Sequence, residues 1–471
     1  EQGGKLGVKV TRLGARWNHI LDGVKAMPTM SKKQEDMMAA MKSAPETMSM
    51  HVMAAPVEPA IVEYALMKDL EGDNIGPPPP RGLPAHIVFP LGDKNLSIRR
   101  NSVDMRANGC TWRGVIEETG EPVMVMWWKD GRFSGMFTYR GRQYTLKSMG
   151  GEIHAVVESD PRKLPPDHGA MPGSKASPDL KDDPLISRGE GDMLRNPSLR
   201  NPSGPGLGRD DGLADRRDGA EPTAARPSPR SASKKPVIAP LSPQQRRALA
   251  QKAVTIDMMV LYTAKVAAKY IDIDADLVQL AIEQTNTSFA NSGAGNVKVR
   301  LVHSEMVAYD ESAGEHFDHL YRMVDGVGTF SKVRALRNEK KADMVVLVVD
   351  DASGCGLSTR VAADAEDAFA VVHHSCAALS YSIAHELGHI MGARPERSID
   401  GNETPFPFGH GYVSGKKWRD IMSYKQSCDG CPRQPFWSNP TMKFLGDRGG
   451  TPDTDNARVV LEQAERVARF R

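Results

Sequence analysis

The stretch IAHELGHIMGARPERSID, residues 383–400, decides the fold and the chemistry that this chain offers. Within it, His385 and His389 stand four positions apart. On an α-helix, side chains at this spacing lie on one face about one turn apart, so both imidazoles can reach the same metal ion. Glu386 follows the first histidine, where it can act as a general base. The stretch therefore predicts a zinc-carrying helix that ends at Gly392.

The chain as a whole has an ordinary globular composition. Of its 471 residues, 40% are hydrophobic and 25% are charged, and the formal net charge is +2. This charge gives no argument for nucleic acid as a partner. No run approaches the ~18 consecutive apolar residues of a membrane span, so none is expected. Residue 1 is Glu, and we therefore expect that the start has been trimmed or that the chain is a fragment.

The composition changes along the first half of the chain. Residues 1–82 are polar and rich in methionine, which predicts a mostly unstructured leader; a Cu(I) site in MSMHVM is the less favoured alternative. Residues 83–160 contain short runs rich in Val, Phe, Tyr and Trp that are separated by Gly and Asp-Gly. Such runs predict successive hairpins and a small antiparallel β domain. Residues 161–252 are rich in Pro, Gly, Ser and charge, which predicts a flexible linker that proteases cut easily.

Residues 253–471 read as an α/β domain. Fully apolar or alternating runs predict strands at 253–263, 297–307, 342–351 and 367–376. Helical spacing of apolar residues predicts helices at 275–290, 316–338 and 380–392.

Several motifs of this domain together resemble a known family. They are DMMVLYT, AIEQTNTSFANSG, ADMVVLVV followed by Cys355-Gly356, AHELGHIMGAR, HGY, IMSY and SNP. With these motifs the domain resembles a reprolysin-like bacterial metzincin and is similar to the peptidyl-Asp metalloendopeptidases. TWRGVI, DGRFSGMFTYRGRQY and GGEIHAVVESDPRKLPPDH, within residues 83–168, are similar to the pro-region of such proteins.

The resemblance implies a fold and a life cycle. The fold would be an α/β metzincin catalytic domain, with a mixed twisted sheet and an active-site helix, preceded by a small antiparallel β prodomain. The protein would be a zymogen that is secreted to the extracellular space or periplasm, masked by its prodomain and activated by cleavage in the linker.

Carried over residue by residue, the resemblance also assigns roles. His385 and His389 would bind Zn²⁺, and Glu386 would be the general base toward a zinc-bound water. Met422, in the IMSY that resembles the metzincin Met-turn, would form the apolar floor under the metal. Tyr424 stands where some metzincins have a tyrosine that moves onto zinc or onto the tetrahedral intermediate; packing beneath the site is the alternative role.

Pro395 departs from the family pattern, because the third histidine ligand falls at this position. A catalytic zinc site needs three protein ligands and an open position. The replacements that the sequence offers are Glu396, His410 in the FGHGY loop, Glu403 and a tightly bound Tyr424. His410 has a loop-bracing role as its alternative, and the Pro- and Gly-rich surroundings of Glu403 do not suit a second helix. The remaining alternative is a weak site without a third ligand.

Four of the five cysteines lie in the last third of the chain, which favours disulfides and an oxidising compartment. In the resembling fold a bridge between Cys355 and Cys376 would tie the region of the edge strand. For Cys428 and Cys431 a short-loop disulfide is favoured over a redox motif or a second zinc site. Cys110 lies upstream, in the expected prodomain. A free buried or surface thiol is favoured for it, and the alternative is a thiolate that caps the zinc of the latent zymogen.

The resulting hypothesis is a secreted zinc metalloendopeptidase precursor. It would bind an extended polypeptide substrate along an edge strand, with zinc as its cofactor and its own prodomain as an intramolecular partner. The alternative is a pseudoprotease that keeps the fold and binds peptides or a partner without turnover. Pro395 argues for the pseudoprotease, and the intact Glu386 argues against it.

Overall fold

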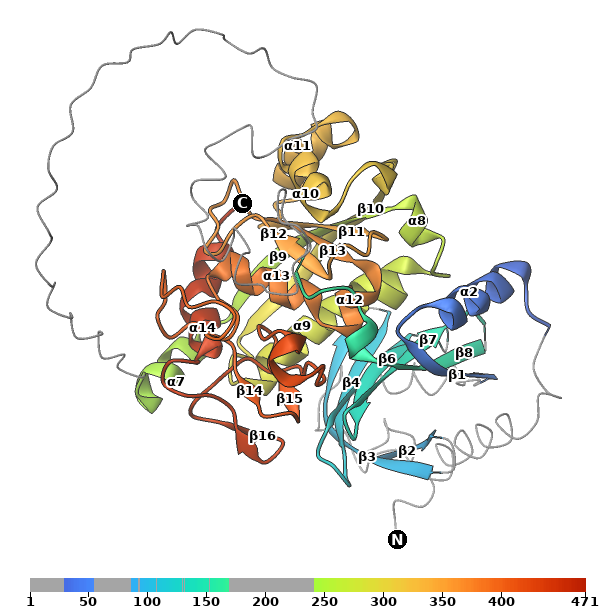
Figure 1. Ribbon diagram of the computed structural model, residues 1–471, viewed down its shortest axis with the longest axis horizontal. Coiled ribbons are helices and arrows are strands. Elements are labelled where there is room, and N and C mark those ends of the chain that lie inside the picture. The colour runs from blue at the N-terminus through green and yellow to red at the C-terminus, as the bar shows by residue number, and fades with distance from the viewer. Residues whose placement is uncertain are drawn as a thin grey trace, which may run out of the picture.

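The computed structural model describes residues 29–54, 86–168 and 241–471, apart from residues 92–93, 107, 129, 131 and 152. These residues form an antiparallel sheet and an α/β domain that pack against each other (Figure 1).

The first part is a sheet of eight antiparallel strands in the order β1-β8-β7-β6-β5-β4-β3-β2. Its strands are β1 (Thr47–Ala54), β2 (His86–Leu91), β3 (Lys94–Arg106), β4 (Gly109–Ile116), β5 (Pro122–Trp128), β6 (Phe133–Tyr139), β7 (Arg142–Ser148) and β8 (Ile153–Ser159). Seven of them lie within residues 83–160, where hairpins are predicted. Turns such as Arg140-Gly141, with φ of 50° and 77°, reverse the chain between neighbouring strands.

The leader contributes to this sheet, so the expectation of a mostly unstructured leader is wrong for residues 32–54. Helix α2 (Lys32–Ser43) begins at Ser31, whose side chain and that of Gln34 cap each other's backbone N–H groups. Met37 and Met41 are its buried residues, and β1 pairs with β8 along its length. The methionines fill apolar space between the helix and the sheet. The other residues of the expected leader, 1–28 and 55–82, lie outside the described part of the chain.

The second part contains a mixed five-stranded sheet in the order β10-β9-β11-β13-β12, in which β12 alone runs antiparallel to its neighbour. Its strands are β9 (Val254–Thr263), β10 (Val297–Val307), β11 (Met344–Val349), β12 (Gly356–Ser358) and β13 (Phe369–His373). Two short hairpins follow, β14 (Val413–Ser414) with β15 (Trp418–Arg419), and β16 (Lys443–Phe444) with β17 (Asp447–Arg448). The predicted mixed sheet is confirmed.

Helices cover both faces of this sheet. They are α7 (Pro243–Gln251), α8 (Ala264–Ala267), the π-helix η4 (Asp274–Gln279), α9 (Leu280–Asn291), α10 (His316–Val324), α11 (Val333–Glu339), α12 (His374–Leu379), α13 (Ser382–Met391) and α14 (Asn456–Val467). Short 3-10 turns are η2 (Pro161–Lys163), η5 (Glu311–Ala313), η6 (Gly328–Lys332) and η7 (Lys425–Cys428). In the described residues, no helix is both long and apolar enough to cross a membrane.

Two predicted elements are divided in the structure. The helix expected at 316–338 breaks into α10, η6 and α11, because Gly326 and Gly328 adopt φ of 67° and 59°. The strand expected at 367–376 ends at His373, whose side chain accepts a hydrogen bond from the backbone N–H of Ser375 and caps α12.

The predicted linker, 161–252, is also wrong at both ends. At its start, η2 and the residues up to 168 lie against the second part, and Lys425 Nζ donates to the carbonyl of Leu164 at 2.5 Å. At its end, α7 is capped by Ser242 and packs beside α14. Residues 169–240 lie outside the described part of the chain.

The motif helix α13 is buried throughout, which allows it to position its side chains rigidly. Gly388 is required by close packing, since a Cβ there would lie 2.5 Å from the sulfur of Met422 and 2.9 Å from the ring of Trp437. Gly392 ends the helix with φ of 113°, as predicted for a C-terminal glycine.

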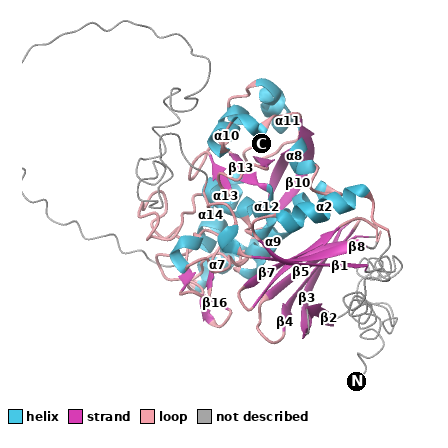
Figure 2. Cartoon of the chain, turned by 45° about the vertical axis from the view of Figure 1, so that its right-hand side comes forward, coloured by secondary structure: helices cyan, strands magenta, loops and turns pink. Residues whose placement is uncertain are grey.

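The two parts share a core. Met124, Met126 and Met136 of the antiparallel sheet join the apolar cluster that contains residues of η4 and α9. Figure 2 shows α9 lying beside the antiparallel sheet. Polar contacts border this cluster: Arg113 pairs with Glu283 at 2.9 Å, and Arg132 pairs with Asp272 at 3.0 Å. The antiparallel sheet is therefore docked on the helices that support α13.

Candidate metal centre

The two motif histidines present a pair of nitrogen lone pairs to each other. Nδ1 of His385 donates to the carbonyl of Ile421 at 2.8 Å, and Nδ1 of His389 donates to that of Ala393 at 3.1 Å. Because a carbonyl only accepts, each Nδ1 carries the proton, and the two Nε2 atoms face each other unprotonated at 3.1 Å. Burial lowers the pKa of both rings, to about 3 for His389. Two converging lone pairs in an apolar site fit a metal cation.

Glu386 lies beside this pair with a carboxylate that needs a partner. The side chain is fully buried, and neither oxygen makes a hydrogen bond of good geometry. Burial raises its pKa to about 8, although Ser358 and Arg433 favour the ionised form. A Cβ on Gly356 would lie 2.1 Å from Oε1, so the edge strand β12 holds the carboxylate closely. An orphaned base next to two imidazoles suits proton transfer at a metal site.

The turn after β15 forms the opposite wall. Asp420 Oδ1 accepts from the N–H groups of Met422 at 3.1 Å and Ser423 at 2.9 Å, which fixes the turn. The sulfur of Met422 packs under α13 at Gly388, and its role as a floor below the metal stays a prediction. The ring of Tyr424 is buried, with its centroid 5.8 Å from that of His385. Tyr424 thus borders the histidine pair, and its proposed catalytic role stays a prediction.

Glu396 has a partner other than the histidine pair. Its Oε2 accepts from the backbone N–H of Tyr424 at 3.1 Å, and Oε1 approaches the same N–H at 3.4 Å. Burial raises its pKa to about 7. This carboxylate braces the turn that carries Tyr424.

His410 likewise contacts the backbone of the motif loop. Its Nδ1 donates to the carbonyl of Pro395 at 2.9 Å, and residue 410 pairs with Arg394 in an isolated bridge. Its Nε2 is buried without a hydrogen-bond partner. Glu403 forms an ion pair with Arg397 at 3.1 Å.

Among the described residues, no further His, Cys, Asp or Glu side chain joins the motif pair in a group of possible ligands. There, the only three His, Cys, Asp or Glu side chains whose ligand atoms lie within 4.8 Å of one another are Asp350, His373 and His374. Glu396 and His410, both predicted as metal ligands, are therefore not brought into such a group with His385 and His389. The backbone orients both side chains: the N–H of Tyr424 binds the carboxylate of Glu396, and the carbonyl of Pro395 accepts from Nδ1 of His410, whose Nε2 therefore does not reach the motif pair.

His168 is a residue of the site that the sequence reasoning missed. It pairs with Gly356 of β12 in a parallel bridge. Its ring centroid lies 6.3 Å from that of His389 and 6.5 Å from that of Tyr424. The expected linker began at residue 161, so LPPDH (164–168) was assigned to it. The available signal was that LPPDH closes the segment that resembles a pro-region, which reaches residue 168.

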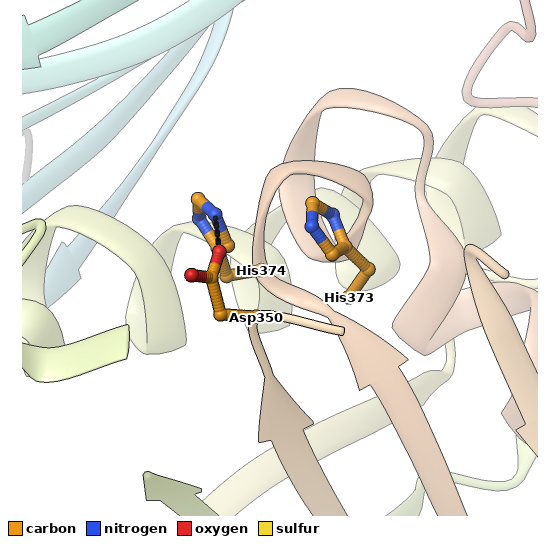
Figure 3. Close-up of side chains that lie close together, drawn as sticks. All are labelled: Asp350, His373 and His374. Carbon is orange, nitrogen blue, oxygen red and sulfur yellow. Dashed lines mark ion pairs between the residues drawn. The ribbon is translucent and has the colours of Figure 1, made fainter. Parts of the chain in front are cut away.

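The group of Asp350, His373 and His374 was also missed, and it lies elsewhere (Figure 3). His374 uses both nitrogens, Nε2 with Asp350 Oδ1 at 3.0 Å and Nδ1 with the hydroxyl of Tyr270 at 3.0 Å. The ammonium of Lys269 lies 3.1 Å from the same Asp350 oxygen. This group lines a cavity of about 520 Å³ between the two parts of the molecule, and the motif residues do not line that cavity.

Both predicted disulfides are present. Cys355 is bonded to Cys376, which links the loop before β12 to α12, and Cys428 is bonded to Cys431. Cys110 is buried in β4, where it pairs with Met105 and Trp127 of the neighbouring strands. In the described residues it does not join the motif histidines in a group of possible ligands.

Comparison with known proteins identifies the domain that carries this centre. Residues 252–438 match the model of a family described as metallo-peptidase family M12. These residues are similar to a reprolysin-like metallopeptidase domain. A domain of this family implies a metal cofactor.

Curated relatives and a solved structure extend the comparison. The chain is 36% identical over 219 residues to a peptidyl-Asp metalloendopeptidase of Xanthomonas campestris pv. campestris, covering 46% of this chain and 52% of the relative. It is 34% identical over 241 residues to a peptidyl-Asp metalloendopeptidase of Stenotrophomonas maltophilia, covering 49% and 57%. The chain thus spans about half the length of these relatives. Metalloproteinase-II from Bacteroides fragilis matches with a TM-score of 0.38 and 11% identity, over 74% of this chain and 87% of that chain, which is too distant to carry an argument.

Proposed function

We propose that this chain is the precursor of a secreted zinc metalloendopeptidase that cleaves polypeptides beside acidic residues. The observation that carries the proposal is the pair of Nε2 atoms, 3.1 Å apart and unprotonated, next to the orphaned carboxylate of Glu386. The acidic preference comes from the relatives, which are named peptidyl-Asp metalloendopeptidases.

Each residue has a role in this proposal. His385 and His389 would hold zinc, and a bound zinc ion supplies Lewis acidity toward a peptide carbonyl and a water molecule. Glu386 would accept the proton of the attacking water and pass it to the leaving amine. Tyr424 would donate a hydrogen bond to the oxygen that becomes negatively charged. Glu396 and His410 hold the surrounding loops: Glu396 accepts from the backbone N–H of Tyr424, and Nδ1 of His410 donates to the carbonyl of Pro395.

The antiparallel sheet would serve as the prodomain. Its core is continuous with that of η4 and α9, and its last residues, up to His168, lie beside the motif histidines. The disulfides suit an oxidising compartment, which supports secretion.

A catalytically impaired pseudoprotease is the second candidate. Pro395 favours it, because the described residues bring no third ligand within 4.8 Å of both motif histidines. A site with two protein ligands would bind zinc weakly.

Zinc content and hydrolysis of the full-length chain test the two candidates. We expect close to one zinc per chain after dialysis against a weak chelator. After limited tryptic cleavage between residues 169 and 240, we expect hydrolysis of a quenched peptide with one internal aspartate. Glu386→Gln should keep the zinc and lose at least about 100-fold in rate. A chain without zinc, or one that binds zinc but does not hydrolyse the peptide, would favour the pseudoprotease. Hydrolysis that survives Glu386→Gln would overturn the role of Glu386 as general base.

A further inference from the structure

Residues Leu164–His168, here called the docked segment, extend the edge of the five-stranded sheet. The backbone N–H of Cys355 donates to the carbonyl of Pro166 at 2.6 Å, and His168 bridges Gly356. Since β12 is the outermost strand, the docked segment occupies the position of an added strand. Proteins that bind extended peptides commonly do so by this kind of strand addition.

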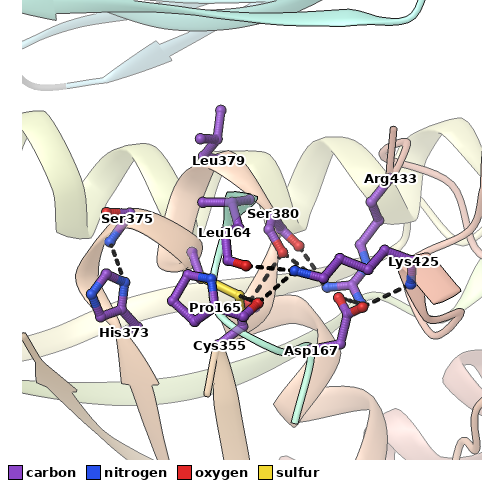
Figure 4. Close-up of a disulfide and its surroundings, with 12 residues drawn as sticks. Leu164, Pro165, Asp167, Cys355, His373, Ser375, Leu379, Ser380, Lys425 and Arg433 are labelled. Carbon is purple, nitrogen blue, oxygen red and sulfur yellow. Dashed lines mark hydrogen bonds and ion pairs between the residues drawn. A yellow bond between two sulfur atoms is a disulfide. The ribbon is translucent and has the colours of Figure 1, made fainter. Parts of the chain in front are cut away.

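The side chain of Asp167 in this segment is bound by two arginines. Its Oδ1 lies 3.0 Å from Nη1 of Arg419 and 2.9 Å from Nη2 of Arg433. Its Oδ2 accepts from the backbone N–H of Lys425 at 2.7 Å (Figure 4). The side chain is 2% exposed. Although burial alone would raise it, the pKa of Asp167 is lowered by the two guanidinium groups.

The two arginines are held in place by the peptidase domain itself. Both donate to the carbonyl of Ser423, Arg419 at 2.6 Å and Arg433 at 3.0 Å. Arg433 also donates to the carbonyl of Ser380 at 2.8 Å. Both guanidinium groups are 1% exposed, and in the described part of the chain Asp167 is the only carboxylate within ion-pair distance of either.

A buried charge that loses its partner is strongly destabilising. If the docked segment leaves, the arginine pair is left without a carboxylate. By contrast, the buried pair of Arg246 and Asp455 joins α7 to the start of α14, so both partners lie within residues 241–471. The arginine pair therefore needs an anion from outside the domain, and a substrate can bring one.

The arginine pair also lies next to the chemistry. Asp167 precedes His168, whose ring faces those of His389 and Tyr424. Arg433 donates to the carbonyl of Ser423, the residue before Tyr424, whose ring borders that of His385. A carboxylate in this position belongs to a residue beside the reacting bond.

We propose that Arg419 and Arg433 determine specificity by binding the side-chain carboxylate of a substrate aspartate beside the cleaved bond, and that Asp167 occupies their site as an internal mimic in the precursor. The proposal rests on the proposed endopeptidase function for its biological meaning. The backbone N–H of Lys425 completes the site, so that both carboxylate oxygens are bound.

Peptide binding to the full-length chain tests the proposal. Glu386→Gln is the background, so that no peptide is cut. The probes are two fluorescent peptides that differ only in a central Asp or Asn, and anisotropy gives their Kd values. We expect the background protein to bind neither peptide, because Asp167 fills the site. Adding Asp167→Ala should open it to the Asp peptide, with the Asn peptide at least about tenfold weaker.

Further variants separate recognition from folding. Arg433→Gln added to Asp167→Ala should abolish the preference for Asp over Asn. Asp455→Asn, which breaks a matched buried ion pair, should lower the thermal unfolding temperature without admitting either peptide. If Asp167→Ala does not fold, Asp167→Asn supplies the same comparison with less change in shape. Equal binding of the two peptides, or a preference that survives Arg433→Gln, would overturn the proposal.

The result is independent of turnover. If the protein prefers the Asp peptide but does not hydrolyse it with Glu386 intact, the proposed function is wrong and the proposed recognition site is supported. A protein that hydrolyses peptides without regard to aspartate would do the reverse.

Discussion

Two histidine groups in the described part of the chain offer a comparison, and the group with fewer possible ligands fits a metal better. Asp350, His373 and His374 offer three possible ligands, whereas the motif helix offers two. In the first group His374 has both nitrogens bonded and Lys269 already supplies a positive charge to Asp350. In the motif pair, backbone carbonyls accept hydrogen bonds from both Nδ1–H groups. The two Nε2 atoms therefore face each other with lone pairs and no proton between them. Whether a histidine group can bind a metal ion depends more on the hydrogen bonds that its nitrogens already make than on the number of possible ligands close together.

The largest expected effect separates the two groups directly. His389→Ala removes one of two protein ligands, so the affinity for zinc should fall by more than the ~10–100-fold that loss of an outer-shell partner costs. His374→Ala should leave the zinc content unchanged, because His374 is engaged by Asp350 and Tyr270. Metal analysis of the full-length chain after dialysis measures both. Loss of zinc in His374→Ala with retention in His389→Ala would reverse the comparison.

The next effect concerns Glu386, the carboxylate beside the motif pair. Gly356→Ala places a Cβ where Oε1 of Glu386 now lies, so Glu386 must move. We expect hydrolysis after tryptic processing to fall by about 100-fold, as for loss of a general base, while zinc content stays the same. Gly401→Ala is the matched control, since a Cβ there meets nothing within 4 Å. Full activity in Gly356→Ala would show that Glu386 does not need its present position.

How much of the fold and of the candidate site the sequence predicts depends on how far apart along the chain the contacting residues are. The helix, its glycine end and the shared face of His385 and His389 follow from local spacing, and these predictions hold. The buried strand β11 follows equally from its unbroken apolar run. Helix α2 was missed although its capping box, Ser31 to Gln34, is a local signal, because the methionines were interpreted as flexible filler.

Contacts between distant residues account for the rest. The docked segment lies almost two hundred positions before β12, as the 190-residue separation of Pro165 and Cys355 shows, and no periodicity links them. The same holds for Asp167 and its two arginines. Glu396 and His410 are reasonable ligands by type, but their engagement by the backbone of Tyr424 and Pro395 depends on how the loops cross.

Pro395→His asks whether the motif pair lacks only a ligand. The backbone directly before this position is held, since the N–H of Arg394 donates to the carbonyl of Gly409 at 2.8 Å and the carbonyl of Arg394 accepts from the N–H of Gly411 at 3.0 Å. A histidine at this position would add a third protein ligand. It should raise zinc affinity by at least roughly 10–100-fold, the effect that a single outer-shell partner already has. Competition with a chelating dye measures the change. An unchanged affinity would mean that the wild-type site already has its third ligand.

The smallest expected effect tests whether the second group behaves as buried neutral imidazoles. Burial, together with the neighbouring His374, lowers the pKa of His373 to about 2. Below its ordinary pKa of 6.5 the unfolded chain takes up a proton that the folded chain refuses, so stability falls as the pH falls. Between pH 7.5 and 5.5 this residue should cost about 1.4 kcal/mol.

His373→Gln removes that dependence and keeps an acceptor for the N–H of Ser375, which His373 Nδ1 now accepts at 3.2 Å. Urea unfolding of both full-length proteins at the two pH values gives the difference. The difference in unfolding free energy between the two proteins should be the same with and without a chelator. Asp350 is already paired with Lys269 and His374, so we expect no metal ion at this group. A chelator-dependent difference would mean that Asp350, His373 and His374 bind a cation. His374 would then give up its hydrogen bond to Asp350 or to Tyr270 in order to bind the cation.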